Sequence, residues 1–194
     1  MRGDGVMKFN MGCGRNKLPG YVNVDSAEGA GADALHDLEQ TPWPWENDCA
    51  DEILFNHSLE HMGADPKVFL AIMGEVYRIA RDGAVVQINV PHPRSDDFIG
   101  DPTHVRPITP QMLSLFDKRK CESWVAQGYA NTPLALYLGV DFETTKALTV
   151  VAEPWLSRLR EKTITDAEMR EAIRTLNNVA TEFRITLQVR KPQA

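Results

Sequence analysis

Residues able to bind a small ligand stand where short apolar segments of this 194-residue sequence end. Two glycines after the first segment would let the backbone turn sharply and approach a ligand closely. An acidic side chain after the second could accept hydrogen bonds from both hydroxyls of a ribose, although a single aspartate could equally cap a turn. The segment ends carry, in order, Gly12-Cys13-Gly14, Asp25, Asp37-Leu38, Asn56-His57 and Pro91-His92.

Elements that position these residues follow the alternating pattern of an α/β fold. Apolar positions recur at helical spacing from 66 to 81, with Asp65 as N-cap and Pro66 in the first turn. Ligands of open α/β sheets bind beyond the carboxyl ends of the strands, so the polar residues should meet at one edge. The expected strands cover 6–11, 21–24, 32–38, 50–55 and 84–90.

The C-terminal half is less regular. We expect a short helix over 109–116, loops and turns over 121–146, a strand over 147–152 and a helix over 165–178. Thr165 and Glu168 form a capping-box pattern at the start of that last helix. The alternating polarity of residues 183–189 favours an antiparallel edge strand, whereas the earlier segments suit buried parallel strands.

Composition places the whole chain, residues 1–194, in one globular domain, with 43% hydrophobic and 25% charged residues. A net charge of −6 disfavours nucleic acid as a partner. No apolar stretch is long enough to span a membrane, and residues 1–6 lack the apolar core of a secretory signal. Three widely spaced cysteines match neither a disulfide framework nor a zinc motif, so we expect a cytoplasmic protein without a metal.

Five ordered segments between residues 7 and 117 resemble the class I S-adenosylmethionine-dependent methyltransferases, especially the small type 11 kind. The resemblance implies a Rossmann-like, mostly parallel sheet with an antiparallel last strand, S-adenosylmethionine as cofactor, and methyl transfer to an acceptor, expected to be a small molecule. The segments are Phe9-Asn10-Met11-Gly12-Cys13-Gly14, Tyr21-Val22-Asn23-Val24-Asp25, Ala50-Asp51-Glu52-Ile53-Leu54, Leu59-Glu60-His61 and Glu75-Val76-Tyr77-Arg78-Ile79-Ala80-Arg81-Asp82-Gly83.

Site roles carried over from the family place the cofactor along the strand ends. The glycine loop would face its methionine part, Asp25 its ribose and Asn56 its sulfonium. Candidates for residues near the transferred methyl group are His57, His61, His92 and His104. The full set implied for the cofactor is Gly12, Cys13, Gly14, Asp25, Asp37, Leu38, Asn56 and His57, with Asp37 and Leu38 flanking the adenine.

The sequence departs from the family pattern directly after the glycine loop. Asn16 stands where a third glycine is usual, and only residues 15–20 separate the loop from the second strand. This connection contains Pro19 and Gly20 and is too short for a crossover helix. We therefore expect the first helix to be reduced or missing, which leaves the N–H groups of the loop to bind the cofactor carboxylate.

An acceptor site is expected where the chain leaves the fifth strand at Pro91 and returns through residues 101–106. That path should bring His92, His104 and Arg106 together, with Asp101 orienting an imidazole. Either histidine could act as base, and Arg106 could bind a carboxylate or phosphate. Alternatively, Asp101 and Arg106 form an ion pair that only fixes the loop. Residues 121–146, or a second subunit of a homo-oligomer, would cover the acceptor.

Three other functions compete with methyl transfer. A dinucleotide enzyme would need a third glycine and a helix after the loop, and neither is present. His57-x-x-Glu60-His61 matches a zinc metallopeptidase pattern, which needs both histidines on one helical face. His57 ends a strand and Gly63 follows closely, so that pattern is disfavoured. A protein that binds the cofactor without turnover remains the third alternative.

Overall fold

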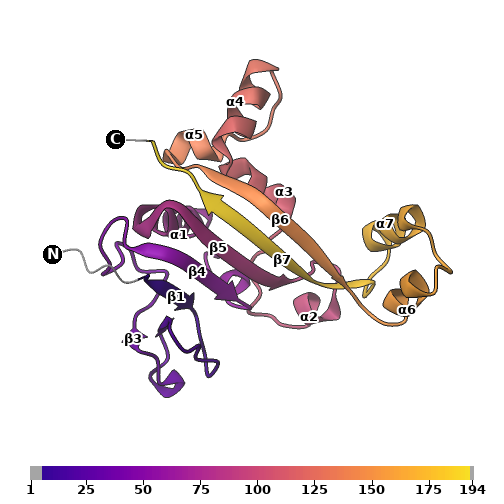
Figure 1. Ribbon diagram of the computed structural model, residues 1–194, viewed down its shortest axis with the longest axis horizontal. Helices are drawn as coiled ribbons and strands as arrows, with labels where there is room; N and C mark the ends of the chain where they lie inside the picture. The colour runs from indigo at the N-terminus through magenta and orange to yellow at the C-terminus, as the bar shows by residue number, and fades with distance from the viewer. Residues whose placement is uncertain (1–5, 193–194) are drawn as a thin grey trace.

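The computed structural model describes residues 6–192 and contains one seven-stranded sheet (Figure 1). The strand order is β3-β2-β1-β4-β5-β7-β6, in which β7 pairs antiparallel with both neighbours and every other pair is parallel. This arrangement confirms the predicted Rossmann-like α/β fold. The strands are β1 (Lys8–Met11), β2 (Val22–Asp25), β3 (Ala34–Leu35), β4 (Ala50–Asn56), β5 (Ala80–Pro91), β6 (Phe142–Val151) and β7 (Ala180–Val189).

Both predicted helix caps are present. The Asp65 carboxylate accepts from the Lys67 N–H at the start of α1, and the Thr165–Glu168 capping box opens α7. The helices are η1 (Glu28–Ala30), η2 (Leu59–His61), α1 (Pro66–Ile79), α2 (Asp96–Ile99), α3 (Pro110–Leu113), η3 (Ser114–Phe116), α4 (Lys118–Ala126), α5 (Leu134–Leu138), α6 (Trp155–Arg160) and α7 (Asp166–Thr175). None of these described helices is long and apolar enough to cross a lipid bilayer. The expectations for residues 1–5 and for the outer limits of the domain lie outside the described residues.

The first crossover helix is missing, as Pro19 and Gly20 predict. Residues 12–21 join β1 to β2 without an α-helix, and neither of the next two connections contains one. The connection from β3 to β4 instead packs two tryptophans against the sheet. Trp43 is buried in the core, and the Trp45 ring lies 4.9 Å from the Phe9 ring. A turn rich in proline and tryptophan therefore covers the part of the sheet that α1 leaves open.

Helices cover the central strands on one face only. Along β5, Val86 and Ile88 are fully buried, whereas the alternate residues Gln87 and Asn89 remain half-exposed. The expectation of strands buried on both faces is therefore wrong for this region. The reason is the short connections between β1 and β4, because they contain no helices to pack on the second face.

Two expectations for the C-terminal half are also wrong. Strand β7 does not lie at the edge, because β6 pairs along its outer side. Residues 121–146 contain most of α4, all of α5 and the start of β6 rather than loops alone. The predicted strand over 147–152 is the second half of β6, whereas the start of this strand was missed; residues 145–149 are all exposed, so the edge strand carries little apolar signal.

Residues 121–146 also lie at the wrong end of the sheet to cover an acceptor. Phe142 at the start of β6 pairs with Val189 at the end of antiparallel β7, which is the amino edge of the parallel strands. The opposite, carboxyl edge is flanked by α2, by the segment 100–109 that follows it, and by the arm formed by α6 and α7 (Figure 1). Asn178 ties this arm to α2 through two hydrogen bonds with Asp96.

An ion pair on α1 holds the tryptophan turn in place. Glu75 accepts two hydrogen bonds from Arg78, at 2.7 and 2.8 Å, and one from the Trp43 N–H at 2.6 Å. Arg78 also donates to the Trp43 and Trp45 carbonyl oxygens. The hydrogen bonds from Arg78 hold the pKa of the Glu75 carboxyl below its usual value.

We expect Glu75→Gln to lower the free energy of unfolding at pH 7 by about 1.5–3 kcal/mol, because charge-assisted hydrogen bonds are lost. The depressed pKa means that this stabilisation is present above the unfolded pKa of glutamate and disappears as the pH falls through the folded pKa. Thermal melts at pH 7 should separate the variant from wild type, and the difference should shrink as the pH falls below the usual pKa of glutamate. Glu171→Gln breaks the exposed Glu171–Arg174 pair of the same spacing and should cost less than about 1 kcal/mol.

Candidate functional site

A cavity of about 340 Å³ lies beyond the carboxyl ends of β1, β2, β3 and β4. Most of the cofactor residues implied by the sequence lie in its wall: Gly12, Gly14, Asp25, Asp37, Leu38 and His57. His61, which the sequence places among the candidates near the transferred methyl group, lines it as well. The remaining lining residues were not predicted, although each neighbours a predicted position within a few residues: Ser26, His36, Glu39, Ser58 and Met62.

Gly12 allows β1 to approach the segment after β4. Its φ of +69° lies in the left-handed region, and a Cβ atom there would come within 2.6 Å of the Ser58 Cβ. Ser58 is buried, and its hydroxyl donates to the Met11 carbonyl oxygen at 2.7 Å. Both the backbone conformation and the close packing therefore require glycine at position 12.

The N–H groups of the glycine loop are used inside the protein. Gly12 and Cys13 both donate to the Val24 carbonyl oxygen at 2.9 Å, and Gly14 donates to the Asp25 carboxylate at 2.7 Å. The expectation that these groups are free for a cofactor carboxylate is therefore wrong. Without a helix to enter, the loop folds back onto the end of β2, which satisfies its donors.

Carboxylates give the cavity a negative wall. Asp25 accepts from the Gly14 and Ala27 N–H groups through different oxygens, so each oxygen keeps a lone pair for a ligand. Asp37 accepts from the Glu39 N–H, and the Glu39 carboxylate accepts from the Gly63 N–H. Three acidic side chains around one cavity favour a ligand that carries hydroxyl donors or positive charge.

Two residues implied by the resemblance lie outside this cavity. Cys13 and Asn56 line a smaller cavity of about 190 Å³ together with Asn10 and Leu54. Asn56 pairs with Asn89 on the half-exposed face of the sheet and accepts a hydrogen bond from it at 2.9 Å. His57 lies beyond the last residue of β4, with a φ of +53°, and lines the large cavity, whereas Asn56 does not; both residues also line a pocket on the half-exposed face of the sheet. Burial raises the pKa of the Cys13 thiol.

The predicted acceptor residues have separate surroundings. The His92 ring packs against Phe183, and its Nδ1 accepts from the Arg94 N–H at 3.1 Å. Burial lowers the pKa of His92, which favours the neutral ring. The Arg106 guanidinium donates to the Gly63 carbonyl oxygen at 2.6 Å. Neither His92 nor Arg106 therefore lines the large cavity, because other contacts hold each side chain elsewhere.

His104 lies beside the cavity and next to His61, with the two rings 4.5 Å apart. Asp101 Oδ2 lies 3.9 Å from His104 Nε2, beyond hydrogen-bonding distance, and the imidazole is instead held by the Phe98 carbonyl oxygen, 2.9 Å from Nδ1. The alternative ion pair between Asp101 and Arg106 is not formed, because Arg106 stacks over the Phe69 ring instead.

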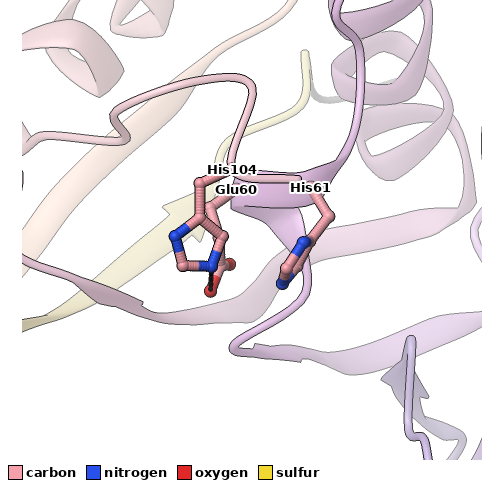
Figure 2. Close-up of side chains that lie close together, drawn as sticks. All are labelled: Glu60, His61 and His104. Carbon is pink, nitrogen blue, oxygen red and sulfur yellow. Dashed lines mark ion pairs between the residues drawn. The ribbon is translucent and has the colours of Figure 1, made fainter. Parts of the chain in front are cut away.

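The metallopeptidase pattern does not have the geometry that such a site needs. His57 follows β4 with a φ of +53°, and residues 59–61 form only one 3-10 turn. His57 and His61 are therefore not one turn apart on an α-helix. Figure 2 shows a different grouping, in which Glu60 and His61 meet His104 from the loop after α2. His104 lies far from Glu60 and His61 in the sequence, so no local sequence pattern predicts this group.

Comparisons with known proteins identify the fold. No protein-family model matches the sequence, and no curated protein matches it. A solved S-adenosylmethionine-dependent methyltransferase from Archaeoglobus fulgidus is 19% identical, with 95% of this chain and 86% of that chain covered and a TM-score of 0.57.

Two further neighbours have similar scores. A Sulfolobus solfataricus protein assigned to the type 11 methyltransferases is 15% identical, with 98% and 87% covered and a TM-score of 0.51. The cyclase SpnF is 12% identical, with 97% and 76% covered and a TM-score of 0.52. The chain therefore has the fold of the class I S-adenosylmethionine-dependent methyltransferases, type 11 proteins included.

Proposed function

We propose that the protein binds S-adenosylmethionine in the 340 Å³ cavity and transfers its methyl group to a small-molecule acceptor. The observation that carries the proposal is the position of Asp25, at the end of β2 and in the wall of that cavity beside Gly12 and Gly14. In sheets of this kind, an acidic residue there binds the ribose of a nucleoside cofactor. The cavity volume is in the range of small-molecule sites.

The charge of the cavity suits this cofactor. S-adenosylmethionine carries a positive sulfonium and an ammonium group, and both gain from the negative potential of Asp25, Asp37 and Glu39. Leu38 and His36 supply the less polar wall beside Asp37 that an adenine needs. With the ribose bound to Asp25 and the adenine packed on Leu38, the sulfonium would lie in the remaining part of the cavity, next to His57 and His61.

Methyl transfer from a sulfonium is a direct displacement, in which the protein mainly aligns the acceptor atom. A base is needed only when the acceptor atom carries a proton that must leave. His104 and its neighbour His61 remain our proposed acceptor-side residues, because their rings meet next to the cavity. His92 would need to exchange its hydrogen bond with the Arg94 N–H before it could accept a proton.

Cofactor binding without methyl transfer is the second candidate. The neighbour SpnF favours it, because a cyclase shares this fold with the methyltransferases. The two functions differ in one product, S-adenosylhomocysteine, which forms only when the methyl group leaves the cofactor.

A turnover assay tests the proposal. S-adenosylmethionine carrying a labelled methyl group is incubated with the protein and a panel of small hydroxyl, amine and thiol compounds. We expect S-adenosylhomocysteine and labelled product to form together with at least one acceptor, and formation to fall by about tenfold or more with Asp25→Ala at subsaturating cofactor. Bound cofactor that yields no S-adenosylhomocysteine with any acceptor would favour the second candidate.

A further inference from the structure

Glu60 has a buried carboxylate that no group in the described structure satisfies. Its side chain is 1% exposed, and neither oxygen has a hydrogen-bond partner. The nearest ionisable groups are His57 Nδ1 at 3.7 Å and His104 Nε2 at 4.0 Å from Oε1. The backbone fixes the residue in place, because its carbonyl oxygen accepts from the N–H groups of Val105 and Arg106. A buried carboxylate without partners is strongly unfavourable, so this site calls for a positive charge.

The hydrogen bonds of His104 place a lone pair opposite that carboxylate. Its Nδ1 lies 2.9 Å from the Phe98 carbonyl oxygen, which can only accept, so Nδ1 carries the proton. In the neutral ring Nε2 is then unprotonated, and this is the atom that faces Glu60. A lone pair and a carboxylate oxygen face each other with no donor between them.

The second histidine is oriented in the same way. The Thr103 hydroxyl donates its single proton to Asp101 Oδ1 at 2.6 Å, because a carboxylate oxygen can only accept. It must therefore accept from His61 Nδ1, which lies 2.9 Å away. In the neutral ring of His61, Nε2 is left free as an electron-pair donor. A carbonyl or hydroxyl acceptor behind each imidazole is the usual outer support of metal-binding histidines.

The three side chains converge from η2 and from the loop after α2 (Figure 2), and one ligand atom from each lies within 4.8 Å of the others. Protonating Glu60 would remove its charge, but the single new proton could be shared with only one imidazole nitrogen, and those nearest to Oε1 lie 3.7 and 4.0 Å away. A cation between the three atoms satisfies all of them at once. Two imidazoles and one carboxylate are donors that suit first-row transition metals such as Zn²⁺ rather than Mg²⁺ or Ca²⁺.

We propose that Glu60, His61 and His104 bind one divalent transition-metal ion, with Zn²⁺ as its simplest probe. Bonds of about 2.0–2.2 Å require the ligand atoms to approach one another, by small side-chain rotations, from their present separations. His61 also lines the 340 Å³ cavity, so the coordination positions that the protein leaves open are next to that cavity. The proposal replaces the expectation of a protein without a metal, and it holds whether or not methyl transfer occurs.

Calorimetric titration of chelator-treated protein with Zn²⁺ tests the site. We expect one ion per chain with a micromolar or tighter Kd, and binding at least about 100-fold weaker in His104→Ala, which loses a direct ligand. His36→Ala is the matched control, because His36 lines the same cavity outside the cluster and its loss should leave the affinity unchanged. Wild type that does not bind Zn²⁺, or a His104→Ala variant that binds as tightly as wild type, would overturn the proposal.

A second variant guards against simple misfolding. Glu60→Gln keeps the shape of the side chain but removes a buried charge that has no partner, so its metal-free form should melt no lower than wild type. Excess Zn²⁺ should then raise the Tm of wild type and leave that of Glu60→Gln unchanged. Equal Zn²⁺-induced shifts in both proteins would show that Glu60 is not a ligand and overturn the assignment.

Discussion

Gly12→Ala should lower the free energy of unfolding by about 2–5 kcal/mol, from roughly 1–2 for a left-handed alanine and 1–3 for overpacking. The φ of +69° supplies the first contribution, and the 2.6 Å approach to the Ser58 Cβ supplies the second. Ser58 cannot move aside easily, because its hydroxyl is bonded to the Met11 carbonyl oxygen in the core. Chemical denaturation measures the loss.

Two other variants isolate the causes of that loss. Gly14 also has a positive φ, of +50°, but nothing lies within 4 Å of the Cβ that alanine would add. Gly14→Ala should therefore cost only the conformational part, about 1–2 kcal/mol. In a Ser58→Gly background the clash is removed, so adding Gly12→Ala should lower the free energy of unfolding by less than it does in wild type. If Gly12→Ala and Gly14→Ala cost the same, the close contact with Ser58 is not what fixes this loop.

Asp25→Ala should weaken the binding of S-adenosylhomocysteine by about 10-fold to more than 100-fold, since charge-assisted hydrogen bonds to the ribose contribute about 1.5–3 kcal/mol. The variant also loses the acceptor for the Gly14 and Ala27 N–H groups, so part of the effect comes from a looser loop. Asp25→Asn retains an acceptor oxygen without the charge and should lie between wild type and alanine. Calorimetric titrations of all three proteins give the order.

Glu28→Gln is the matched control for Asp25. Glu28 is an exposed acid in η1, close to Asp25 in the sequence and outside the cavity lining. Glu28→Gln should leave the affinity for S-adenosylhomocysteine unchanged if Asp25 acts by direct hydrogen bonds rather than through the general negative potential of the cavity. An Asp25→Ala protein that binds as tightly as wild type would exclude the ribose assignment.

Local signals in the sequence predicted much of the fold. The helical spacing and N-caps of α1 and α7 specify where these helices begin, because those contacts are made within a few residues. Pro19 and Gly20 likewise predicted the missing crossover helix, since a short connection cannot contain one. The glycine loop and Asp25 predicted the cavity, because parallel strands end at the same edge of the sheet.

Long-range contacts account for what the sequence did not predict. The N–H groups of the glycine loop donate to the Val24 carbonyl oxygen because no helix follows the loop, and no residue type in the sequence predicts these hydrogen bonds. Asn56 and His57 are neighbours in sequence, but β4 ends between them and only His57 lines the large cavity, so their roles depend on where β4 ends. The approach of His104 to Glu60 is set by the path of the loop after α2.

Titration of the wild-type protein with S-adenosylhomocysteine is the direct test of the proposed cofactor site. We expect one site per chain, a Tm that rises with ligand concentration through mass action, and no comparable binding of NAD, because no helix follows the glycine loop to bind a pyrophosphate. Absence of both heat and Tm shift at millimolar S-adenosylhomocysteine, or tighter binding of NAD, would contradict it.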